Sequence, residues 1–168
     1  ENCTLYLDYT HARSLDSRHH ESRSWVKQYH TTFCNDIPEG WRICGENMYA
    51  YHSIMYYGLP SYFIVFGIYD EKNICLSWDE TVEWAAMLGL NTAPVLYRGI
   101  WNERAVQACW TGGSKFDGEQ EGYVVRLASS FDNHALIKYV RPGHVQTDEH
   151  WMEGPVIPNH LKSQVTHE

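Results

Sequence analysis

The sequence predicts an α+β domain, in which a mainly antiparallel sheet carries helices on its outside. The strongest strand pattern is Tyr62–Tyr69 (YFIVFGIY), which is apolar on both faces and is therefore expected at the centre of the sheet. Ser77 and Glu80 form a capping-box pattern, which starts a helix. Two short apolar runs, Gly122–Leu127 and Leu136–Val140, flank a polar turn and predict a hairpin.

The remaining elements follow from periodicity and turn signals. Apolar residues at helical spacing, among them Trp25 and Tyr29, predict a helix over Ser22–Phe33. Glycine ends two further helices, because it readily adopts the backbone conformation that follows a helix. The other expected elements are strands over Cys3–Asp8, Trp41–Cys44 and Pro94–Tyr97, and helices over Ser77–Gly89 and Asn102–Trp110.

The length and the lack of an internal linker predict a single domain over residues 1–152. Residues 153–168 are polar and are expected to form a flexible tail or the start of a further region. The chain starts with Glu1 rather than Met, in a segment with the pattern of a strand. We therefore expect it to be a piece of a longer protein.

Composition limits the kinds of partner. The formal net charge of −8 argues against a broad basic face that coats nucleic acid, whereas a few local cations suit phosphate chemistry in a cleft. Five scattered cysteines without a C-x-x-C predict reduced thiols in a cytoplasmic protein. No apolar run approaches the roughly 20 residues of a membrane span. The ten histidines lack the spacing of a zinc site, so solvated or packed histidines are the better interpretation.

Four short motifs each have a plain structural explanation when taken alone. R-I-C-G-E-N (42–47) could be a strand that ends in a turn, and Y-F-I-V-F-G-I-Y-D (62–70) could be core. E-G-Y-V-V-R (121–126) and I-K-Y-V-R (137–141) could be ordinary surface strands. Their order along the chain makes the combination more specific than any one of them.

In that order, the motifs resemble motifs III, IIIa, IV and V of the covalent nucleotidyltransferases, which comprise ATP-dependent ligases and mRNA capping enzymes. The text around them, from H-A-R-S-L-D-S-R-H-H (11–20) to H-V-Q-T-D-E-H-W-M (144–152), resembles the RNA ligase branch. The resemblance covers residues 1–152. It implies a nucleotidyltransferase domain of two packed, largely antiparallel sheets with flanking helices.

Lys115 opens K-F-D-G, which matches the family's K-x-D-G nucleophile motif. That motif comes first in the family, whereas the look-alikes of motifs III and IIIa all precede Lys115 here. We therefore interpret Asp117-Gly118 as a turn before the strand at Glu121. The family motif often continues as K-x-D-G-E-N, and Glu1-Asn2 matches its last two residues. The nucleophilic lysine is accordingly expected upstream of Glu1.

The resemblance also implies a role for each matched residue. Phe66 would stack on adenine, and Glu46 would accept a hydrogen bond from a ribose hydroxyl. Glu121 would help to place Mg²⁺ or Mn²⁺ near the lysine, and Lys138 would contact the α-phosphate. The phosphates, or metal-bound water, would be contacted by Asn2 and Arg13. The second cation of motif V is displaced by one residue to Arg141, on the other face of the strand, so Lys138 is the better candidate.

The sequence therefore favours an ATP-dependent RNA ligase domain that acts on RNA ends or a nicked duplex. It leaves two alternatives open. One is a DNA ligase or a capping-type enzyme, although these more often carry arginine at the position of Asn2. The other is a module that binds nucleotides or RNA ends without chemistry.

Overall fold

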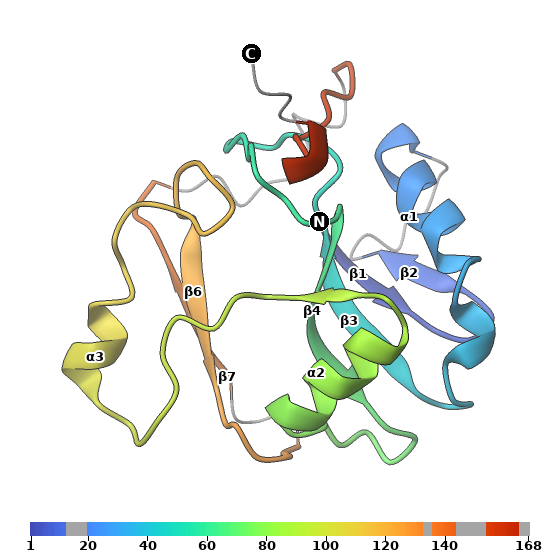
Figure 1. The fold of residues 1–168 in the computed structure, drawn as a ribbon, viewed down its shortest axis with the longest axis horizontal. Helices are drawn as coiled ribbons and strands as arrows, with labels where there is room; N and C mark the ends of the chain where they lie inside the picture. The colour runs from blue at the N-terminus through green and yellow to red at the C-terminus, as the bar shows by residue number, and fades with distance from the viewer. Residues whose placement is uncertain (13–19, 133–135, 144–153, 165–168) are drawn as a thin grey trace.

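The computed structural model describes residues 1–12, 20–132, 136–143 and 154–164 (Figure 1). It contains one five-stranded sheet, one two-stranded sheet and a few short helices. The large sheet has the order β2-β1-β3-β4-β5 and is antiparallel except for the pair β4 and β5. The α+β, mainly antiparallel class expected from the sequence is confirmed. The strands of this sheet are β1 (Asn2–Leu5), β2 (Thr10–Ala12), β3 (Arg42–Asn47), β4 (Phe63–Tyr69) and β5 (Asn91–Thr92).

The second sheet is the predicted hairpin, in which β6 (Gly122–Arg126) pairs antiparallel with β7 (Leu136–Val140). The guanidinium of Arg126 joins it to the large sheet. It donates to the carbonyl oxygen of Phe66 at 3.4 Å and to that of Leu76 at 2.7 Å. One side chain thus ties β6 to the centre of the molecule.

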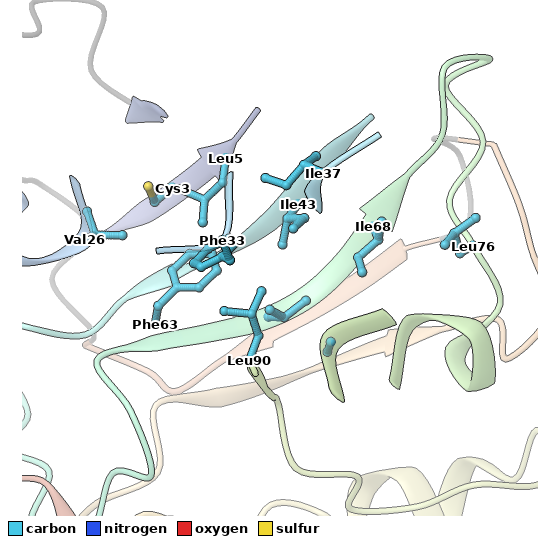
Figure 2. Packing of buried hydrophobic residues seen from close by; sticks show 12 residues of the cluster. Cys3, Leu5, Val26, Phe33, Ile37, Ile43, Phe63, Ile68, Leu76 and Leu90 are labelled. Carbon is cyan, nitrogen blue, oxygen red and sulfur yellow. The ribbon is translucent and has the colours of Figure 1, made fainter. Parts of the chain in front are cut away.

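Two helices cover one face of the large sheet. They are α1 (Ser24–His30) and α2 (Trp78–Met87), and both contribute buried side chains to the main core (Figure 2). The capping box of Ser77 and Glu80 is present at the start of α2. The core residues are Cys3, Leu5, Val26, Phe33, Ile37, Ile43, Phe63, Val65, Ile68, Leu76, Ala85 and Leu90. The short elements η1 (Glu21–Arg23), η2 (Cys34–Asp36), α3 (Glu103–Gln107) and η3 (Lys162–Gln164) complete the described structure.

A second cluster lies around residues 48–62, and it includes Ile64 from β4 and Leu161 from the end of the chain. Residues 153–168 were expected to form a flexible tail or the start of a further region, and within this segment Asn159 is only 2% exposed. Its side chain accepts from the backbone nitrogen of Tyr56 at 3.0 Å and donates to the carbonyl of Met48 at 2.8 Å. The side-chain amide of Asn159 thus satisfies backbone groups of a segment about a hundred residues earlier. The polar composition of the chain end does not reveal this contact.

The strand predicted over Pro94–Tyr97 is wrong. The parallel neighbour of β4 is β5, which pairs with Ile64 and Val65. After β5, the backbone nitrogen of Ala93 donates the last hydrogen bond to β4, at the carbonyl of Val65. Pro94 has no N–H group to continue the ladder, so pairing ends there. The helix expected over Ser22–Phe33 starts with the 3-10 turn η1, and its α-helical part, α1, ends at His30. No helix among the described residues is long and apolar enough to cross a membrane.

Asn159→Ala should lower the free energy of unfolding by about 2–4 kcal/mol, because it leaves buried backbone groups of Tyr56 and Met48 without partners. Urea unfolding followed by circular dichroism measures this. Asn35→Ala, at an exposed site, serves as the control and should change stability by less than about 0.5 kcal/mol. Equal unfolding midpoints for the two variants would contradict the role of Asn159.

Candidate functional site

A small hollow of about 60 Å³ lies where β3 ends and β6 begins. Two of the predicted site residues, Glu46 and Glu121, line it together although they are far apart in the chain. Glu46 lies on β3 of the large sheet and Glu121 immediately before β6 of the small sheet, so residues of both parts line the hollow. The complete lining is Glu1, Glu46, Asn47, Met48, Ala50, His52, Ile54, Tyr56, Glu121 and Asn159.

The position of Glu46 follows from the glycine before it. A Cβ atom at Gly45 would lie 2.6 Å from the carbonyl oxygen of Ile64 and 2.5 Å from the ring of Phe63, so only glycine lets β3 approach β4 so closely. Glu46 is then the direct cross-strand partner of Ile64 on one side and of Asn2 on the other. Its side chain is 41% exposed, and its carboxylate lies 3.6 Å from the N-terminal nitrogen of Glu1.

Phe66 lies at a break in the ladder between β3 and β4. Gly45 pairs with Val65 and Cys44 pairs with Gly67, so Phe66 is an extra residue on β4 with no partner on β3. Such a β-bulge re-aims a side chain and often lies beside an active site. Phe66 is 40% exposed, whereas the rest of β4 is buried. It follows Ile64, the partner of Glu46, by two residues, and its carbonyl accepts from Arg126 of β6.

Glu121 immediately precedes β6, and its carbonyl oxygen accepts from the backbone nitrogen of Arg141 at 2.9 Å. Tyr56 is buried near both acidic residues of the hollow. Burial raises the pKa of Tyr56, and the charges of Glu121 and then Glu46 raise it further, while Arg141 opposes them. The carboxylates of Glu46 and Glu121 thus lie close enough together to act on the same buried phenol.

Lys138 lies on β7 directly opposite Val124 of β6 and is exposed. Opposite residues in an antiparallel pair share a face, and side chains two residues apart share it too. Arg126, which reaches β4, is therefore on the same face as Lys138 and Val124. Lys138 is not among the residues that line the hollow. The displaced cation of the motif, Arg141, forms an ion pair with Glu119.

The other predicted residues also differ in whether they lie near the hollow. Asn2 is the cross-strand neighbour of Glu46 and is exposed, so both side chains project from one face of the sheet. Arg13 lies outside the described residues. Lys115 is exposed, and the backbone of its K-F-D-G turn packs on residues 57–58, to which Phe116 and Asp117 offer carbonyl oxygens. Lys115 is not a lining residue of the hollow.

Sequence reasoning missed several residues of the site. Glu1 has a buried side chain, which receives two hydrogen bonds from the guanidinium of Arg23, one of them 3.0 Å long. This pair lies at a second hollow of about 130 Å³ on α1 and β1, which adjoins the first through Glu1 and Asn47. The match of Glu1 to the family's K-x-D-G-E-N was the one signal available for it. Tyr56 and Asn159 lie outside every motif.

Divalent cations such as Mg²⁺ bind hard oxygen ligands, often one or two carboxylates together with substrate phosphates and water. Glu46 and Glu121 provide such carboxylates beside a phenol whose pKa their charges raise. Among the residues that the structure describes, no three His, Cys, Asp or Glu side chains gather closely enough to hold a metal ion. The site thus fits a cation held partly by a phosphate ligand better than a closed protein cage.

Comparison with known proteins identifies the family of this chain. The family model described as RNA ligase matches residues 1–140, and these include Asn2, Glu46, Phe66, Glu121 and Lys138. No curated protein and no solved structure matches this chain. The match covers residues 1–140 of the 168-residue chain. The chain therefore belongs to the RNA ligase family.

Proposed function

We propose that this chain is the adenylyltransferase domain of an ATP-dependent RNA ligase, which passes AMP through a lysine adduct to an RNA 5′-phosphate. The observation that carries the proposal is the meeting of Glu46 and Glu121 at one hollow, with the exposed Phe66 on the adjacent bulge. A single mononucleotide has to contact all three. Membership of the RNA ligase family supports the same reaction class.

Each residue type suits one part of AMP. The exposed ring of Phe66 offers a flat apolar surface to adenine, and the carboxylate of Glu46 can accept from a ribose hydroxyl. Lys138, on the face of β6–β7 that also carries Arg126, is the proposed partner of the α-phosphate. Asn2 and Arg13 are proposed to bind phosphate or metal-bound water.

The reaction forms a P–N bond between the lysine amine and the α-phosphorus of ATP, and breaks the bond to the β-phosphate so that pyrophosphate leaves. The amine must be deprotonated to attack, which cationic neighbours and burial favour. From the order of the motifs, the lysine is expected upstream of Glu1. The backbone nitrogen of Glu1 donates to Asn47, which places this end of β1 beside Glu46.

Two transfers follow. An oxygen of the RNA 5′-phosphate attacks the α-phosphorus, and the P–N bond breaks to release the lysine. The 3′-hydroxyl of the second RNA end then attacks the activated 5′-phosphorus, and AMP leaves as the new phosphodiester forms. Mg²⁺, held in part by Glu121, would neutralise the charge that develops on the phosphoryl oxygens.

Phe66→Ala should weaken AMP binding by at least about fivefold, because base–aromatic stacking contributes about 1–3 kcal/mol. Isothermal titration calorimetry of AMP with Mg²⁺ measures the dissociation constant. Trp101→Ala removes an aromatic side chain that is 61% exposed and lies outside the site, so it should bind AMP as the unchanged chain does. Equal affinities of the Phe66 and Trp101 variants would argue against adenine stacking at the bulge.

A chain with K-x-D-G restored before Glu1 should take covalent label from α-labelled ATP with Mg²⁺, in an acid-labile, base-stable bond. Glu121→Ala or Lys138→Ala should reduce this labelling by at least about a hundredfold, the usual cost of losing a group that stabilises developing charge. Lys115→Ala and Glu83→Ala should leave it nearly unchanged, since Lys115 lies in an exposed turn and Glu83 on the exposed side of α2.

The 168-residue chain itself should take no label. Labelling of that chain, abolished by Lys115→Ala, would instead make K-F-D-G the nucleophile motif and overturn the order of motifs. If the restored chain binds AMP but never forms the adduct, the alternative of a non-catalytic nucleotide-binding module would hold.

A further inference from the structure

An exposed aromatic stack lies directly beside the hollow. The ring of Tyr57 stacks on that of His160, with centroids 5.5 Å apart and planes 17° apart. Tyr57 is 52% exposed, and His160 is exposed as well. The residue before each of them, Tyr56 and Asn159 respectively, lines the hollow. The stack therefore marks the outer side of the wall that encloses the proposed nucleotide site.

Backbone hydrogen bonds hold this stack in place. The nitrogen of His160 donates to the carbonyl of Tyr56 at 2.9 Å, and the nitrogen of Tyr57 donates to the carbonyl of Asp117 at 3.0 Å. The nitrogen of Gly58 donates to the carbonyl of Phe116 at 2.9 Å, which holds the same turn against this segment. The rings are preorganised, which lowers the entropic cost of placing a further ring on them.

Two exposed lysines flank the stack. Lys115 lies in the K-F-D-G turn, which packs on residues 57–58, and the nitrogen of Lys162 donates to the carbonyl of Leu59. Neither side chain has an ion pair among the described residues, whereas the fold engages Arg23, Arg98 and Arg141 in such pairs. The carboxylate of Asp117 lies in the same turn as Lys115, and the nearby carboxylate of Glu119 is paired with Arg141.

We propose that Tyr57, His160, Lys115 and Lys162 bind a single-stranded RNA end, which places its terminal phosphate at the hollow. The proposal rests on the function proposed above. An unpaired base can stack on the exposed rings, and lysines can bind the phosphates on either side of it. A continuous duplex offers no free base face to the stack. This assigns a role in RNA binding to the lysine that matches the nucleophile motif.

The test measures fluorescence anisotropy of a labelled, 5′-phosphorylated single-stranded RNA of 12 nucleotides against the 168-residue chain. Tyr57→Ala and His160→Ala should weaken binding by at least about fivefold, the lower end of the effect of losing one stacked base. Tyr57→Phe keeps the ring and should retain binding. Lys115→Glu and Lys162→Glu should weaken it and flatten its dependence on salt, because phosphate contacts are lost.

The chain offers matched controls at the opposite end of the sheet. Tyr9 is 55% exposed and stacks on Tyr6 at 4.4 Å, in the turn that follows β1 at the end away from Glu1. Lys72 is exposed in the turn after β4. Tyr9→Ala and Lys72→Glu should therefore bind the RNA as tightly as the unchanged chain does.

Equal loss of affinity in the Tyr57 and Tyr9 variants, or no loss in either, would overturn the proposal. A blunt duplex that binds as tightly as the single strand would overturn it too. AMP binding, measured by calorimetry on the same variants, should not change. The calorimetry separates the RNA-binding proposal from the proposed nucleotide site. If the unsubstituted chain fails to bind AMP, the nucleotide site is refuted, whatever the RNA measurements show.

Discussion

The antiparallel ladder between β3 and β4, interrupted once at Phe66, is the constraint on which the rest of the site depends. Gly45 permits the close approach of the two strands, and the register then puts Glu46 between Asn2 and Ile64. The extra residue in β4 leaves the side chain of Phe66 partly exposed on a strand that is otherwise buried. A one-residue change of register would turn the acidic and aromatic groups away from each other.

The second constraint is the attachment of distant segments to that ladder. Arg126 ties β6 to the bulge, and this brings Glu121 to the same hollow as Glu46. Asn159 satisfies buried backbone groups of residues 48–56 and thereby closes the opposite wall. Polar groups buried in this way specify one arrangement, because every alternative leaves some of them unsatisfied. The hollow is thus formed by side chains that no local motif contains.

The sequence predicted the elements whose signals are local. The capping box at Ser77 and the hairpin of β6 and β7 were both found where expected, since periodicity and turn residues determine them. Strand pairing also depends on residues far apart in the sequence. The strand expected to start at Pro94 is absent, and β5 pairs with β4 just before that residue. The ordered motifs named Glu46 and Glu121, which both line one hollow, but also Phe66 and Lys138, which do not line it. Asn159 could not be foreseen, because its partners are set by tertiary contacts alone.

The most direct test of the account is a titration of the isotopically labelled 168-residue chain with AMP and Mg²⁺, followed by two-dimensional NMR of the backbone amides. We expect the signals of Glu46, Phe66 and Gly122 to shift together along one binding curve, while those of the remote turns at Tyr9 and Lys72 stay in place. Shifts confined to other parts of the chain, or no shifts at millimolar AMP, would contradict the claim that these residues form one nucleotide site.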